Sequence, residues 1–112
     1  MIAAALTLAL CPTPPVPRHH CVHDGDTLWL EGEKIRIADI DTPELNGRCE
    51  RERKLAIKAR DRLIELVNRR SFEFERIGRD TFGRTLARMP EISEQLVREG
   101  LAQRWKERGS WC

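Results

Sequence analysis

The first half of the chain alternates apolar and polar residues in a way that predicts β-strands. Residues 21–30 and 34–40 are β-prone and alternate in part, so that Leu28 and Leu30 fall on one face. Such alternation is typical of a half-buried strand. Residues 31–33 are charged around a central glycine and separate the two stretches, so we expect a hairpin.

Farther along the chain, apolar residues recur every three or four positions, which predicts two helices. In residues 48–70 this period places five apolar side chains on one face: Leu55, Ala59, Leu63, Leu66 and Val67. Pro90 opens the second helix, as proline often does at the first helical position. Its apolar face consists of Ile92, Leu96, Val97 and Leu101, and Gly100 marks its end.

Two more strands are expected between the helices. Phe72 and Phe74 alternate with glutamates, which predicts a fourth strand over residues 72–75. Residues 78–83 are polar with a glycine at each end and predict a turn. Residues 85–89 then predict a fifth strand.

The N-terminal residues 2–10 are apolar, and four prolines follow them at Pro12, Pro14, Pro15 and Pro17. The apolar stretch is either the remnant of an export signal or a first, edge strand. We therefore divide the chain into an apolar, proline-rich segment, residues 1–19, and one domain, residues 20–112. A chain of 112 residues has room for a single core.

The order of elements predicts the fold class. Three strands, a helix, two strands and a final helix are compatible with a mainly β, mixed α+β fold. The specific expectation is a five-stranded Greek-key barrel of the OB type with two to three helices.

The four cysteines, Cys11, Cys21, Cys49 and Cys112, lack the CxxC spacing of a structural zinc site. We interpret them as disulfide partners, with three pairings open. Disulfides and the apolar N-terminus together indicate a secreted or periplasmic protein, although a cytoplasmic location stays open. Nothing in the sequence predicts a membrane partner, and we expect a monomer.

The net charge of +2 is too small to indicate a nucleic-acid binder, but its distribution is uneven. Residues 24–44 contain seven carboxylates against two bases, a local balance of −5, which is suited to holding a cation. Residues 48–62 contain seven bases against three carboxylates, a balance of +4, which is suited to attracting a polyanion. A solvated helix face is the alternative for the basic stretch.

The acidic stretch contains the parts of a metal-assisted phosphodiesterase. A hard cation requires oxygen ligands, and Asp26, Asp41 and a backbone carbonyl near Thr42 provide them. Glu44, just beyond these ligands, is a candidate general base for an attacking water. Asp24 precedes Gly25 and is read as a supporting turn residue.

Phosphate gains negative charge in the transition state of hydrolysis, so planar bidentate donors are favourable there. Arg36 on the second strand of the hairpin and Arg84 after Gly83 are the candidates. In one regular strand, the side chains of Arg36 and Asp41 would point to opposite faces of the sheet. Both reach one site only if the strand bulges or ends near Asp39.

Three blocks of sequence resemble the signature motifs of the thermonuclease (staphylococcal nuclease) family, in the same order: VHDGDTLWL, KIRIADIDTPE and DTFGRTLARM. The resemblance spans roughly residues 21–105. It implies an OB barrel and a nuclease that hydrolyses DNA and RNA, with single strands preferred.

The resemblance also implies roles for individual residues. Asp26, Asp41 and the Thr42 carbonyl would bind one calcium ion, and Glu44 would activate water. Arg36 and Arg84 would contact phosphate, with products ending in 3′-phosphate.

The family commonly has a tyrosine where this chain has Phe82, and the chain contains no tyrosine. Base stacking would then rely on Phe82 or Trp105, since any aromatic face can stack on a base. Two alternatives to an enzyme stay open: a catalytically inactive OB module that binds single-stranded nucleic acid, and a small disulfide-bonded structural domain.

Overall fold

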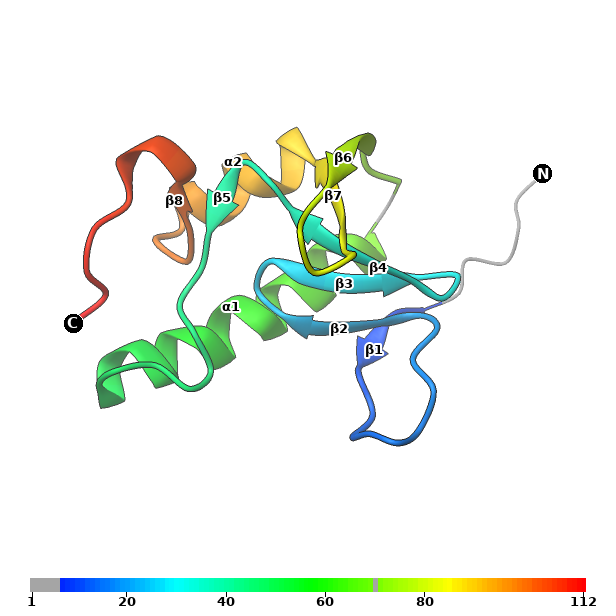
Figure 1. Cartoon of the computed structure of the whole chain (residues 1–112). Helices are drawn as coiled ribbons and strands as arrows, with labels where there is room; N and C mark the ends of the chain where they lie inside the picture. Colours follow the sequence, from blue (N-terminus) through cyan, green and yellow to red (C-terminus); the bar gives the residue numbers. More distant parts are fainter. Residues whose placement is uncertain (1–6, 70) are drawn as a thin grey trace.

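The computed structural model describes residues 7–69 and 71–112. Part of the apolar N-terminal stretch and the predicted last residue of the first helix therefore lie outside the described residues. Within them the fold is a mixed α+β arrangement with two α-helices, which confirms the predicted class (Figure 1).

Six strands form one sheet in the order β1-β2-β3-β4-β7-β6. Their bounds are Ala9–Leu10 (β1), Cys21–Asp24 (β2), Thr27–Leu30 (β3), Glu33–Ile37 (β4), Glu75–Arg79 (β6) and Thr85–Arg88 (β7). A separate pair joins Ile40–Asp41 (β5) to Gln103–Arg104 (β8). The pairings among the described strands leave β1 and β6 at the edges, so they do not close the five-stranded barrel that the sequence predicted.

The predicted hairpin is present, because β3 and β4 pair antiparallel with Leu28 opposite Ile35. The prediction of one strand over residues 21–30 is wrong: a turn at Gly25 and Asp26 folds this stretch into β2 and β3, which pair antiparallel. The Asp24 side chain accepts the Asp26 backbone N–H at 3.2 Å, a local bond that competes with a continuous strand.

The fourth strand lies later than predicted. Phe72 and Phe74 are outside any strand and pack against the core, and β6 runs from Glu75 through the expected turn residue Gly78. All five residues of β6 are exposed, which explains why no apolar alternation marks this strand. The fifth strand is confirmed as β7.

Both helices bury most of their predicted apolar faces, but Leu55 is only half-buried and Ala56, which was not predicted, is buried. Helix α1 (Glu50–Arg69) buries Ala56, Ala59, Leu63 and Val67 at helical spacing. Helix α2 (Pro90–Arg98) begins at its proline and buries Ile92 and Leu96. Gly100 follows α2 with a φ of 76°, a conformation that favours glycine, so its predicted role as a stop is confirmed.

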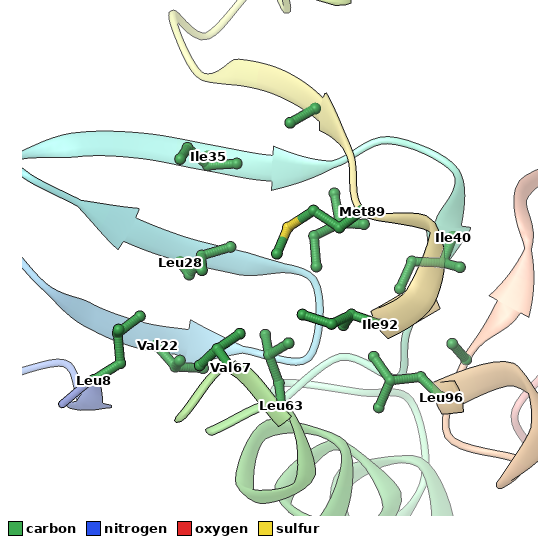
Figure 2. Close-up of a cluster of buried hydrophobic side chains, with 13 residues drawn as sticks. Leu8, Val22, Leu28, Ile35, Ile40, Leu63, Val67, Met89, Ile92 and Leu96 are labelled. Carbon is green, nitrogen blue, oxygen red and sulfur yellow. The ribbon is translucent and has the colours of Figure 1, made fainter. Parts of the chain in front are cut away.

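The core lies between the sheet and the two helices. Figure 2 shows side chains from the sheet, α1 and α2 gathered in one cluster, with Met89 between β7 and α2. The fully buried members include Leu28, Ile35, Leu63 and Leu96. This cluster fixes the strand ends that carry the predicted site.

All four cysteines are in the described residues and form two disulfides, Cys11–Cys21 and Cys49–Cys112. The first joins the end of β1 to β2, and the second joins the residue before α1 to the last residue of the sequence. Disulfides of this kind are typical of proteins outside the cytoplasm.

Neither helix in the described part of the chain combines the length and the hydropathy that crossing a bilayer requires.

Leu63 tests the packing of α1 against the sheet. Because its side chain is fully buried, Leu63→Ala should lower the free energy of unfolding by about 3 kcal/mol through lost burial and a residual cavity. Ile57 on the same helix is 45% exposed and serves as the matched control. Urea unfolding should show a clearly smaller loss for Ile57→Ala, and equal losses would contradict the described face of α1.

Candidate active site

The turn between β2 and β3 is held close to two other segments by Gly25. A Cβ atom at this position would lie 2.9 Å from the Ala59 Cβ of α1 and 3.0 Å from the Thr42 side chain. Real Cβ atoms essentially never come within 3.0 Å of another atom, so the 2.9 Å approach to Ala59 requires glycine at this position. The approach brings the Asp24–Asp26 turn beside Thr42, which is itself buried.

Asp26 is the most deeply buried acid of the site, with 6% of its surface exposed. Burial and the neighbouring Asp24 carboxylate raise its pKa to about 6, and the Arg36 guanidinium and the Thr42 hydroxyl oppose this rise. Its carboxylate lies 3.4 Å from the Arg36 guanidinium and accepts the Thr27 hydroxyl at 3.2 Å. The Asp26 carboxylate is thus held in place from several sides.

Arg36 reaches the site because β4 ends one residue later. Residues 38–39 form a turn between β4 and β5, which removes the conflict between the directions of Arg36 and Asp41 in one regular strand. The guanidinium donates to the backbone carbonyl of Ile37 and, at 3.1 Å, to that of Ile40. Arg36 therefore bridges the turn to Asp26.

Asp41 is the last residue of β5, and Thr42 follows it. Because β5 pairs antiparallel with β8, Asp41 lies opposite Gln103. Partial burial raises the pKa of Asp41, the Asp26 carboxylate adds to this rise, and the Trp111 indole N–H opposes it. Trp111 donates to the Asp41 carboxylate at 3.5 Å. Thr42 and Pro43 are buried, so the backbone is fixed at the predicted carbonyl ligand.

Glu44 lies at the exposed end of this segment. Partial burial raises its pKa, and the Asp26, Asp41 and Glu52 carboxylates add to the effect. A carboxylate whose pKa moves toward neutrality is a better match for proton transfer at physiological pH.

Glu52 was not predicted, yet it fixes the backbone around Glu44. Its carboxylate accepts the backbone N–H of Glu44 at 3.0 Å and that of Arg48 at 3.1 Å. It is 7% exposed, on the buried face of α1 one turn before Ala56. An acid in register with an apolar helix face was the signal in the sequence, although it did not identify the partners.

The site meets part of what a calcium ion requires. The burial of Asp26 beside Asp24 and Asp41 concentrates negative charge that a cation would stabilise. No group of three or more His, Cys, Asp or Glu side chains gathers as a metal site in residues 7–69 and 71–112. The predicted ligand set contains two such side chains and a carbonyl, so it fits the residues present only if water completes the shell.

Phe82 and Arg84 lie in the segment that connects β6 to β7. Arg84 donates to the Asp80 carboxylate at 2.6 Å, and Asp80 also accepts the backbone N–H groups of Phe82 and Arg84. Arg84 directly precedes β7 and lies two residues before Leu86, which pairs with Arg36 of β4. The two arginines are thus offset by roughly 7 Å of strand. Phe82 is 83% exposed.

Trp105 lies in the short 3-10 helix η1 (Trp105–Glu107) after β8. Its ring is 5.4 Å from the Arg36 guanidinium and 3.7 Å from that of Arg108. It also lines an open cavity of about 480 Å³ together with Ile40 and Val97. Of the two aromatic residues predicted to bind substrate, Phe82 is the more accessible.

Residues 34–110 match the family described as staphylococcal nuclease homologue. The chain belongs to this family. The match contains Arg36, Asp41, Glu44 and Arg84, and it confirms the resemblance seen in the motifs. The family implies an OB-like fold. Asp26 precedes the matched residues and is connected to them by its contact with Arg36.

The chain is also similar to a Haemophilus influenzae protein named "uncharacterized endonuclease". The two are 30% identical over 95 aligned residues, which cover 77% of this chain. The chain spans about half the length of that curated relative.

Gly25 tests the close approach that assembles the site. Gly25→Ala should lower the free energy of unfolding by about 1–3 kcal/mol, because the added methyl group collides with Ala59 and Thr42. Gly109→Ala is the matched control, since no described atom lies within 4 Å of a Cβ placed there. Equal unfolding midpoints in urea for the two variants would contradict the close approach.

The raised pKa of Asp26 predicts a pH-dependent cost to stability. The folded state retains a proton up to about pH 6, whereas the ordinary value is 3.8. The contribution of Asp26 to the free energy of unfolding is therefore fully present below pH 3.8 and is lost as the pH rises through 6. Asp26→Asn cannot ionise, so its stability relative to the unsubstituted protein should increase between pH 4 and pH 7 by up to about 3 kcal/mol.

Urea unfolding in the presence of a chelator at both pH values measures this difference. Asp61→Asn, at a carboxylate whose side chain is 60% exposed, is the control and should show no such change. A difference between Asp26→Asn and the unsubstituted protein that stays constant with pH would be incompatible with the raised pKa.

Proposed function

We propose that this protein is a calcium-dependent nuclease that hydrolyses phosphodiester bonds of DNA and RNA and leaves 3′-phosphate ends. The observation that carries the proposal is the contact between buried Asp26 and Arg36, next to Asp41, in a member of the staphylococcal nuclease homologue family. A buried acid cluster beside an arginine is costly for stability alone and suits a cation and a phosphate.

Asp26, Asp41 and the Thr42 carbonyl are the proposed ligands of one calcium ion. Support comes from the burial of Asp26 and from the proximity of its carboxylate to Asp41, whose pKa it helps to raise. When bound, calcium supplies positive charge that stabilises the negative charge gained by the phosphate in the transition state.

Glu44 is the proposed general base. Its carboxylate accepts a proton from the attacking water, whose oxygen forms the new bond to phosphorus while the bond to the 5′-oxygen breaks and that oxygen takes up a proton from solvent. The raised pKa of Glu44 supports this role, and Glu52 holds its backbone in place.

Arg36 and Arg84 are the proposed phosphate contacts. Arg36 is already oriented by Asp26 and by two backbone carbonyls, so its binding to phosphate requires little reorganisation. Arg84 is paired with Asp80 and would share its donors between that carboxylate and the substrate. In this position it would stabilise the leaving 5′-oxygen.

Phe82 and Trp105 are the proposed stacking platforms for bases, which favours single-stranded substrates because their bases are free to stack. The exposure of Phe82 supports the first assignment, and the cavity beside Trp105 supports the second. The two disulfides support a secreted or periplasmic location, and we propose that the protein acts there as a monomer.

Cleavage of single-stranded DNA and of RNA by the purified protein tests the proposal. Calcium should support cleavage, a chelator should abolish it, and Glu44→Gln should reduce kcat by about 100- to 10,000-fold because the base is lost. Glu50→Gln, at a carboxylate whose side chain is 76% exposed on α1, is the matched control and should cleave normally.

The products identify the bond that breaks, because a 3′-phosphate end resists a ligase and yields inorganic phosphate to a phosphatase. Binding of single strands without cleavage would favour an inactive OB module. Neither binding nor cleavage would favour a structural domain.

A further inference from the structure

The segment of residues 105–112 runs back along the site instead of away from it. In Figure 1 this red segment leaves β8 and approaches the start of α1. One end is held by a hydrogen bond from the Trp105 backbone N–H to the Asp39 carbonyl at 3.1 Å. The other end is held covalently by the disulfide between Cys49 and Cys112, 63 residues apart in sequence. The segment is therefore fixed at both ends.

Between its two anchors, the segment touches two of the proposed site residues. The Trp105 ring lies against Arg36, and the Trp111 indole N–H donates to the Asp41 carboxylate. The contact between Trp111 and Asp41 is not local, because the two residues are 70 positions apart in the sequence. Trp111 is half-buried, so its side chain has a defined place in the fold.

The same segment forms one wall of an open cavity of about 550 Å³. Its lining includes Trp111 and Cys112 together with Glu44 and residues 46–48. The proposed general base thus lines the same cavity as the residues that the Cys49–Cys112 disulfide anchors.

We propose that Trp111 is a positioning residue for Asp41 and that the Cys49–Cys112 disulfide holds Trp111 in place, so that calcium affinity depends on this bond. The inference rests on the proposed function, because it takes Asp41 as a calcium ligand. Trp111 and Cys112 follow the residues that match the family, which end at 110.

The physical reason is the directionality of a carboxylate ligand. A carboxylate has about four acceptor positions on two oxygens, so one indole N–H occupies one position and leaves the rest for a cation and water. Hydrogen bonds to metal ligands fix their orientation, and their loss typically weakens metal binding by 10- to 100-fold. A disulfide that holds the donor fixed reduces the entropy lost when the metal binds.

Calcium binding to the purified protein, measured by isothermal titration calorimetry, tests the proposal without relying on activity. Trp111→Phe keeps a ring but removes the N–H, and Cys49→Ala/Cys112→Ala releases the anchor. Each should weaken calcium binding by about tenfold or more. Cys11→Ala/Cys21→Ala is the matched control, because it removes the other disulfide, which joins the end of β1 to β2, strands that contain none of the proposed calcium ligands, and its affinity should be unchanged.

Circular dichroism of each variant confirms that it is folded at the temperature of the titration. If the Cys49→Ala/Cys112→Ala protein does not fold, Trp111→Phe carries the test alone, because a ring-conserving change leaves the disulfide intact. Unchanged affinity in Trp111→Phe would overturn the positioning role, and equal weakening in the two disulfide variants would overturn the specific role of Cys49–Cys112.

Cleavage assays on the same variants separate this inference from the proposed function. Calcium binding without cleavage in the unsubstituted protein would refute the nuclease and leave the affinities to decide the role of Trp111. Absence of calcium binding in the unsubstituted protein would overturn both. If cleavage is present, Trp111→Phe should require roughly tenfold more calcium for half-maximal rate, with kcat at saturating calcium nearly unchanged.

Discussion

The contact at Gly25 is the constraint on which the site depends. Here the turn between β2 and β3, the segment after β5 and the buried face of α1 come together at distances that admit no side chain. Each segment contributes a different component: Asp26 from the turn, Thr42 beside the proposed calcium ligand Asp41, and the helix that carries Glu52. Because three segments distant in sequence meet at one point, the packing of the core and the geometry of the acids are not separable.

The same packing places negative charge where water is scarce. Asp26 is buried next to other carboxylates, and Arg36 offsets this only in part, since the pKa of Asp26 remains raised. A protein selected for stability alone would replace such a group with an apolar one. The arrangement is instead favourable for a site that must bind a cation and a phosphate without reorganising, because its dipoles and charges are already in position.

The sequence predicted the parts of the fold that follow from local patterns, and missed those that depend on distant partners. The β3–β4 hairpin and both helices have apolar periodicity, whereas β6 is wholly exposed and Phe72 and Phe74 pack beside the sheet. For the site, motifs indicated Asp26, Arg36 and Asp41. They could not indicate the Glu52 contacts or Trp111, whose bond to Asp41 spans 70 residues.

The edge strand β6 has a consequence for the behaviour of the protein in concentrated solution. Among the described residues no strand pairs with the outer side of β6, and in an apolar strand such an edge would allow another chain to add to the sheet. All five residues of β6 are exposed, and three of them, Glu75, Arg76 and Arg79, are charged. Bringing two such edges together would require desolvating charged side chains and accommodating a bulge between Arg76 and Gly78. Charge and irregularity thus protect the edge against β-aggregation.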